Sequence, residues 1–251
     1  MRITCLGTGT SHGIPVMGCT CSVCRSQDPR NNRWRSSVLI ELAEGAYVID
    51  TPQEFRLQVL RANVNTLNGV FYTHTHADHI FGIDDLRVFS RHQKLPIYGD
   101  TNTLKHIFRT FNYMFSDRVQ GSGVPNLLLH DMEHAPVEIG SLHAACVPVY
   151  HGSERISGFR LGPFAYVTDC SRIPRQSIDA LKGLEVLILG ALRYKKHPTH
   201  FSIHEALEVL EILRPRMAYL THLCHDIDHA VLESALPQGT APAYDGLTID
   251  L

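Results

Sequence analysis

Residues 73–80 read Thr-His-Thr-His-Ala-Asp-His-Ile, and this stretch is the most informative part of the chain. It places three imidazoles and one carboxylate within six residues, directly after the apolar run 70–72. Imidazole nitrogens and carboxylate oxygens are ligands that borderline divalent metals bind. His74 and His76 alternate by two, so an extended segment points both side chains the same way. Asp78 and His79 follow the turn and can face a second ion, so we predict a metal site here rather than a solvated polar loop.

The H-x-H-x-D-H spacing after a hydrophobic strand resembles the metallo-β-lactamase superfamily of metal-dependent hydrolases. This resemblance implies an α/β fold, a four-layer αββα sandwich, with a two-metal site at one edge. It also implies further ligands at three later strand ends, in a fixed order. His151, Asp169 and His222 fall at those positions, each at the end of an apolar run. The resemblance therefore extends over nearly the whole chain.

The same resemblance distributes the ligands between two divalent ions, which we expect to be Zn or Mn. One ion would be held by His74, His76 and His151, and the other by Asp78, His79 and His222. Asp169 would bridge the two, because a carboxylate has two oxygens. Two ions roughly 3.5–4 Å apart share a water and lower its pKa toward about 7, which suits attack on phosphorus or an acyl carbon. Asp50 is expected to orient His74 or His76; a carboxylate that only caps a turn is the alternative.

A second cluster lies in Gly-Cys-Thr-Cys-Ser-Val-Cys, residues 18–24. Three thiolates at C-x-C-x-x-C spacing form a zinc-ligand set that lacks one member. The cluster, together with residues 6–15, resembles the bacterial phosphodiesterases of the phosphonate-degradation pathway. That resemblance implies a structural zinc on Cys19, Cys21, Cys24 and His225. Buried free thiols are the alternative, and Cys224 is a competing ligand.

The phosphodiesterase resemblance also picks out His200, which lies just before a predicted helix. The expected catalytic residues are His200 and Asp78. His200 would contact the scissile phosphate and protonate the leaving oxygen. The helix that follows could add a favourable dipole for an anion. Arg193 and Lys196 could hold a substrate phosphate, or could belong to a solvated loop.

These features favour a metal-dependent hydrolase, specifically a phosphodiesterase. We expect it to open a small cyclic phosphate, with a ribosyl group, through a hydroxide shared by both ions. A ribonuclease Z that matures tRNA 3′ ends is the second interpretation, although no Gly/Pro/Lys-rich arm is visible. Thiolester hydrolysis of the glyoxalase type leaves His200 and the cysteines without a role. A non-catalytic relative that only binds small molecules is disfavoured by the complete ligand set.

The length of 251 residues fits one large α/β domain or two small ones. Because no Ser/Gly-rich linker divides the chain, we expect one domain spanning residues 1–251, with a small zinc-binding loop near residues 19–24. The formal net charge of −2 argues against an extended nucleic-acid-binding surface, so a small phosphate ester is the expected partner. The first seven residues are too poor in apolar side chains for a signal peptide, and no run could span a membrane. Seven cysteines indicate a reducing cytoplasm rather than a disulfide framework. A homodimer is compatible with all of this.

Apolar runs bounded by turn residues predict strands, and apolar residues at helical spacing predict helices between them. A helix over 101–111 would be capped by Thr101, and a second would begin at the capping box of Ser202 and Glu205. Residues 116–125 are rich in Gly and Ser and predict a long loop that could cover the site. The predicted strands are residues 3–6, 38–42, 47–50, 70–73, 97–99, 142–149, 164–168, 186–189, 217–221 and 247–251.

Overall fold

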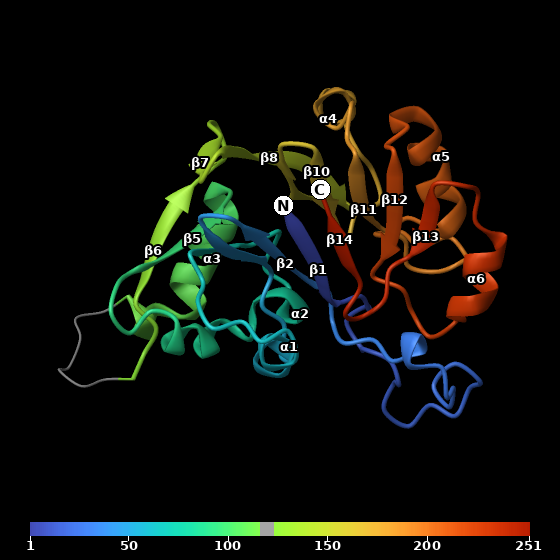
Figure 1. The fold of residues 1–251 in the computed structure, drawn as a ribbon, viewed down its shortest axis with the longest axis horizontal. Coiled ribbons are helices and arrows are strands. Elements are labelled where there is room, and N and C mark those ends of the chain that lie inside the picture. The colour runs from blue at the N-terminus through green and yellow to red at the C-terminus, as the bar shows by residue number, and fades with distance from the viewer. Residues whose placement is uncertain (116–122) are drawn as a thin grey trace.

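The computed structural model describes residues 1–115 and 123–251, which build two seven-stranded sheets that face each other (Figure 1). The first sheet runs in the order β14 (Thr248–Asp250), β1 (Arg2–Gly7), β2 (Ser37–Leu42), β3 (Gly45–Ile49), β4 (Gly69–Phe71), β5 (Leu95–Gly99) and β6 (Leu127–Asp131). The second runs β13 (Thr240–Pro242), β12 (Met217–Thr221), β11 (Val186–Gly190), β10 (Phe164–Val167), β9 (Glu154–Leu161), β8 (Leu142–His151) and β7 (Val137–Ile139).

The two sheets share one plan, in which antiparallel pairing gives way to parallel pairing. In the first sheet β14 to β3 pair antiparallel, and β3 to β6 pair parallel. In the second sheet β7 to β10 pair antiparallel, and β10 to β13 pair parallel. Because parallel strands need a crossover connection, helices follow the parallel strands in both halves.

Helices cover the outer face of each sheet, so the molecule has four layers. Figure 1 shows α1 (Phe55–Arg61), α2 (Ala77–Ile80) and α3 (Thr101–Thr110) beside the first sheet, and α4 (Arg175–Ala180), α5 (Ile203–Leu213) and α6 (His229–Ala235) beside the second. Short 3₁₀ helices span Pro29–Asn31, Ile83–Val88 and Asn112–Met114. The predicted αββα sandwich is therefore confirmed.

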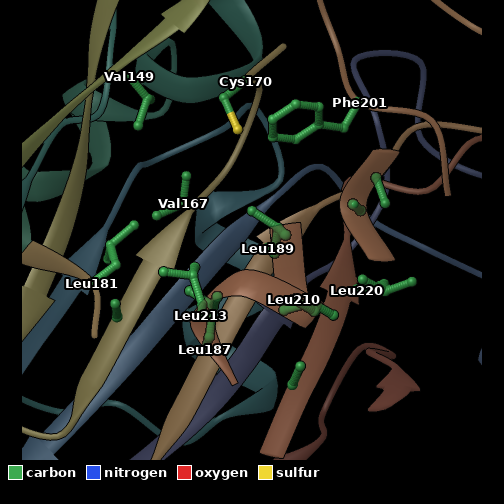
Figure 2. Close-up of a cluster of buried hydrophobic side chains, with 14 of the residues drawn as sticks. Val149, Val167, Cys170, Leu181, Leu187, Leu189, Phe201, Leu210, Leu213 and Leu220 are labelled. Carbon is green, nitrogen blue, oxygen red and sulfur yellow. The ribbon is translucent and has the colours of Figure 1, made fainter. Parts of the chain in front are cut away.

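Alternation along the strands divides the core into three apolar clusters. In β11, Val186 and Ile188 face the cluster between the sheets, whereas Leu187 and Leu189 face the cluster under α4 and α5. Figure 2 shows Leu187 and Leu189 in this outer cluster, near Leu210 and Leu213 of α5. Both faces of a central strand are thus covered, which explains why these strands read as continuous apolar runs.

The two predicted helices are present, with one correction. Ser202 and Glu205 form the expected capping box at the start of α5. The cap of α3 is Asp100 rather than Thr101, because the Asp100 carboxylate accepts the Thr103 N–H at 2.9 Å. The Thr101 hydroxyl instead donates to Asp131 of β6. Aspartate and threonine are both good caps, so the sequence left the boundary open by one residue.

All ten predicted strands are present, and β6, β7, β9 and β13 were missed. In β9, Arg155, Ser157 and Arg160 interrupt the apolar pattern. Two of the other missed strands, β7 and β13, have only three residues each. Of the predicted loop at 116–125, residues 116–122 lie outside the described residues, and 123–126 have no regular structure. Within the described ranges, no helix is long and apolar enough to cross a membrane.

Candidate metal centre

The ends of several strands meet at one edge of the sandwich and carry the predicted ligands. His74 and His76 follow β4, His151 is the last residue of β8, Asp169 follows β10, and His222 follows β12. Asp169 and His222 both have positive φ, at +54° and +59°. Such backbone is uncommon outside glycine and recurs at functional sites, where the surrounding structure must hold it.

One group of donor atoms is formed by Asp78, His79, Asp169 and His222, and all four residues are buried. The Nε2 atom of His222 lies 3.1 Å from Oδ2 of Asp169 and 3.8 Å from Oδ2 of Asp78. The Nε2 atom of His79 lies 3.4 Å from both carboxylates. These are the residues that we expect to hold the second ion together with the shared Asp169, and their donor atoms all lie within 4.8 Å of one another.

The residues predicted to hold the other ion lie next to this group. The His76 ring is 4.6 Å from the His74 ring and 5.0 Å from the His151 ring, centre to centre. The Nε2 atom of His74 lies 4.0 Å from Oδ2 of Asp169. Asp169 therefore faces donors from both predicted sets, as a bridging carboxylate must.

His200 lies closer to this group than the sequence suggested. Its Nδ1 atom is 4.0 Å from Oδ2 of Asp169, and its ring is 4.5 Å from the His151 ring. Donor atoms of His151, Asp169 and His200 all lie within 4.8 Å of one another, so His200 stands within reach of a ligand position. His76 is more exposed, and its Nε2 atom lies 4.0 Å from Oε2 of Glu154.

The donor set fits divalent cations, because several of its buried ring nitrogens have no hydrogen-bond partner. The Nε2 atoms of His74 and His79 and both ring nitrogens of His222 are buried without a hydrogen-bond partner. A buried polar atom left unpaired costs free energy, so native proteins seldom keep several together. Imidazoles and carboxylates that converge in this way are typical ligands of Zn and Mn.

Charge inside the cluster is concentrated on Asp169 and its histidine neighbours. Burial alone would raise the pKa of Asp169, but His222 and His79 outweigh burial and hold this pKa well below its usual range. Burial likewise opposes the charge on His222, yet Asp169 raises the pKa of His222 to about 9. Burial and the nearby His222 lower the pKa of His200 to about 3, so His200 is neutral at pH 7 before ions and substrate bind.

Asp50 orients a different histidine from the two that we expected. Its Oδ2 atom lies 2.7 Å from Nδ1 of His79, and its carboxylate also accepts the N–H and hydroxyl of Thr73. Asp50 thus leaves Nε2 of His79 free for an ion, which is a common arrangement around metal-bound histidine. The prediction for His74 or His76 was wrong because α2 turns His79, not the strand-end histidines, toward β3.

Sequence reasoning missed two further supporting residues. The Thr73 hydroxyl lies 3.0 Å from Nδ1 of His74. The backbone carbonyl of Thr199 accepts a hydrogen bond of 2.8 Å from Nδ1 of His151. Each contact leaves the outer nitrogen of its histidine, Nε2, facing the centre. The only available signal was adjacency in sequence, since Thr73 precedes His74 and Thr199 precedes His200.

The four residues of the cysteine cluster lie together in the structure. The Sγ atoms of Cys19, Cys21 and Cys24 lie 3.2, 3.6 and 3.5 Å from Nδ1 of His225. Zn–S bonds of about 2.3 Å and Zn–N bonds of about 2.0–2.1 Å place tetrahedral ligand atoms at roughly this spacing. The pKa of Cys21 is lowered to about 6, mainly because its sulfur accepts a hydrogen bond from the backbone N–H of Cys24, and this favours the thiolate. The Sγ atom of Cys224 accepts the N–H of Asp226 instead of joining the cluster.

The two cations near His200 are turned toward the protein surface. The Arg193 guanidinium donates to the backbone carbonyls of Lys195 and Lys196. The Lys196 ammonium lies 3.5 Å from the Glu205 carboxylate and is largely exposed. In this arrangement neither cation has a contact with the His/Asp cluster, which leaves a phosphate-binding role for them as a prediction.

Comparison with known proteins gives a family match and a close structural relative. The model of the "Beta-lactamase superfamily domain" matches residues 46–223. The crystal structure of a new diphosphatase from the PhnP family superposes with a TM-score of 0.92 and 38% sequence identity, covering 99% of this chain and 97% of that one.

Curated relatives match over part of their own length. An octanoyltransferase from Porphyromonas gingivalis is 36% identical over 254 residues, which cover 98% of this chain and 51% of the relative. A ribonuclease Z from Nostoc punctiforme is 24% identical over 198 residues, covering 74% of this chain and 52% of the relative. The chain thus spans about half the length of the curated relatives it matches.

Proposed function

The chain belongs to the beta-lactamase superfamily, and from this premise we propose that it is a metal-dependent hydrolase, a phosphodiesterase that opens a small cyclic phosphate. The observation that carries the proposal is the position of Asp169, whose carboxylate faces histidines from both predicted ligand sets. Such a centre suits a phosphate ester, because developing charge on the phosphorus oxygens needs cationic partners.

We assign His74, His76, His151 and Asp169 to one ion, and Asp78, His79, His222 and Asp169 to the other. Two divalent ions in these positions would supply an activated water and neutralise charge on the phosphate. Asp50, Thr73 and the Thr199 carbonyl hold the histidine rings so that their outer nitrogens point inward. With these supports the rings need little rearrangement when ions bind.

His200 is assigned to the leaving group. Its ring lies 4.9 Å from the His222 ring and 4.5 Å from the His151 ring, so it borders the centre. His200 is neutral at pH 7 in the metal-free protein because burial and His222 lower its pKa. An arriving phosphate carries negative charge, which raises the pKa of a nearby imidazole and allows it to protonate a leaving oxygen.

The substrate is proposed to be a ribosyl 1,2-cyclic phosphate. The resemblance of the His/Asp centre, the cysteine cluster and His200 to cyclic phosphate phosphodiesterases supports this choice. The similarity to a diphosphatase supports a second candidate, the cleavage of a diphosphate linkage. Both reactions transfer a phosphoryl group to water and would use the same centre.

We further propose that Cys19, Cys21, Cys24 and His225 hold a structural zinc. His225 is three residues beyond His222, so this zinc would anchor the N-terminal loop beside the catalytic ligands. The spacing of the donor atoms in this cluster supports a tetrahedral ion.

The test is a substrate panel with Mn- or Zn-loaded protein. It compares a ribosyl 1,2-cyclic phosphate, a nucleoside diphosphate ester, a precursor tRNA and a thiolester. We expect turnover of the cyclic phosphate, and we expect Asp169→Ala to abolish it and to lower the metal content. Cleavage of the diphosphate alone would move the assignment to the second candidate. Cleavage of the tRNA alone, or full activity of Asp169→Ala, would contradict the proposal.

A further inference from the structure

We propose that Arg33 is a positioning residue for His222, one of the ligands assigned in the proposed function on which this inference rests. Arg33 is only 1% exposed and lies outside the cluster of His and Asp residues. It acts through two backbone segments that flank His222. Its role is therefore to fix the geometry of the second ion without contacting ion or substrate.

The Arg33 guanidinium joins three parts of the chain. One terminal nitrogen, Nη1, donates to the Thr8 hydroxyl at 2.8 Å and also to the Ala243 carbonyl. The other, Nη2, donates to Nδ1 of His229 at 3.0 Å. A planar fork with several fixed donors can hold partners in a defined relative orientation, which a single ammonium cannot do.

Thr8 and Ala243 are both hydrogen-bonded to the segment that carries His222. The Leu223 N–H donates to the Thr8 carbonyl at 3.0 Å, and the Ala243 N–H donates to the Leu220 carbonyl at 2.8 Å. Leu220 and Leu223 lie on either side of His222 in sequence. Arg33 therefore holds together the two segments that are hydrogen-bonded to residues on either side of His222.

His222 needs such support because its backbone is unfavourable. Its φ of +59° lies in the left-handed region, which a non-glycine residue keeps only when its surroundings fix it. The Thr10 N–H also donates to the Leu223 carbonyl at 3.2 Å, so the loop after β1 holds both polar groups of that residue. A shift of this loop would move the His222 ring relative to Asp169.

The charge on Arg33 is balanced within the same network. The Thr8 hydroxyl accepts from Arg33 and donates to Oδ1 of Asp245 at 2.7 Å, so it bridges cation and anion. Asp245 also accepts the Trp34 N–H at 2.7 Å. Removing two charges from water is costly, so a buried cation and anion that are bridged by one hydroxyl point to a role in orientation rather than in stability.

Arg33 also closes the loop that holds the cysteine cluster. Its backbone exchanges two hydrogen bonds with Ile14, each of 2.8 Å, so residues 14–33 form a closed loop that contains Cys19, Cys21 and Cys24. The loop is therefore connected to the segment that carries His222 in two ways. One connection runs through the proposed zinc ligands, which include His225, and the other runs through Arg33.

The experiment compares Thr8→Val with Thr8→Ser. Valine keeps the shape of threonine but removes the bridging hydroxyl, whereas serine restores it. Chelator-treated protein with its cysteine-bound zinc restored is titrated with Mn²⁺ alone and followed by EPR, which distinguishes one bound ion from a coupled pair. We expect Thr8→Val to weaken formation of the pair by about tenfold, the lower range for outer partners of metal ligands, and Thr8→Ser to restore it.

A second variant and a control complete the design. Arg33→Lys keeps the positive charge but not the forked guanidinium, so it should weaken formation of the Mn²⁺ pair as Thr8→Val does. It replaces Thr8→Val if that variant does not fold. Arg30→Lys is the matched control, since Arg30 pairs with Asp28 and Glu233 and has no contact with Thr8 or Ala243.

Pair formation as tight as in the wild type would overturn the role of Arg33. Equal weakening of the pair and of the cysteine-bound zinc would also overturn it, because that pattern indicates a general loss of structure. The titration contains no substrate, so these outcomes are separate from failure of the proposed activity in the substrate panel.

Discussion

At the scale of single residues, the chemistry depends on Asp169 and on the direction of the histidine rings around it. Asp169 lies within 4.0 Å of ring nitrogens from His74, His79, His200 and His222. A carboxylate surrounded in this way is stabilised as an anion even though it is almost fully buried. The same field keeps His222 protonated until an ion displaces the proton.

This competition between proton and ion predicts how metal affinity depends on pH. The pKa of His222 is raised to about 9 in the metal-free protein, so below that pH a proton occupies the nitrogen an ion needs. We expect affinity for the ion held by His222 to rise between pH 6.5 and 9, with protons released on binding. Isothermal titration in buffers of different ionisation enthalpy measures both quantities. Affinity that is flat across this range would contradict the prediction.

His200 can be tested separately from the ligands. We expect His200→Ala to retain both ions and to lose about 10²–10⁴-fold in kcat, the usual contribution of a general acid. The control is His204→Ala, because His204 is exposed and pairs with Glu208 on the same helix. Metal content and turnover are measured on the same samples. Unchanged kcat in His200→Ala would remove the residue from the mechanism.

The motif at residues 74–79 indicated a metal site through its residue types and spacing, whereas the candidate ligands on later strands were expected from the family resemblance. His74, His76, Asp78 and His79 form one compact motif, and the other members follow strand ends. The partner of Asp50 was not predictable, since it depends on how α2 sets the His79 ring against β3. Arg33 was also not predictable, because a lone arginine in sequence carries no sign that it will be buried.

At the scale of elements, strand ends and short loops carry the function, whereas helices serve mainly as cover. Strand cores were easy to predict from continuous apolar runs, because both faces of central strands are buried. The edge strands β7 and β13 were not, since their three residues bury little apolar surface. The loop at residues 14–33 has no regular structure to predict beyond one 3₁₀ turn, yet it positions the three cysteines of the proposed zinc site.

The cysteine loop gives a prediction at this scale. We expect Cys21→Ser to lose about one zinc per chain and to lower Tm by roughly 4–8 °C, which corresponds to about 2 kcal/mol in a chain of this size. Cys224→Ser is the matched control, because Cys224 adjoins His225 but lies outside the cluster. Elemental analysis and calorimetry provide the readouts. Full zinc content in Cys21→Ser, or its loss in Cys224→Ser, would refute the assigned ligand set.

At the scale of the whole molecule, the centre exists only when the two sheets pack together. Asp50, His74 and His79 come from the first sheet and its connections, whereas His151, Asp169 and His222 come from the second. The apolar cluster between the sheets contains residues from both, including Phe71 and Phe159. Stability of this middle layer and geometry of the centre are therefore linked.

Phe71 tests how much this middle layer contributes to stability. It is fully buried, stacks on Tyr98 at 4.7 Å and contacts Phe159 across the interface at 5.2 Å between ring centres. We expect Phe71→Ala to reduce the free energy of unfolding by about 3–5 kcal/mol through lost burial and a cavity. Phe108→Ala, at a position that is 49% exposed, should change it by about 0.5 kcal/mol or less. Urea unfolding of both variants measures the difference, and equal losses would contradict the proposed role of the middle layer.

We propose that one shared carboxylate, that of Asp169, holds a pair of ions beside a separate zinc. Anomalous X-ray diffraction from crystals of the chain loaded with Zn and Mn tests it most directly. We expect two peaks roughly 3.5–4 Å apart on either side of Asp169, and a third peak, at the zinc edge, among Cys19, Cys21, Cys24 and His225. A single ion at the His/Asp cluster, or a pair that does not share Asp169, would contradict it.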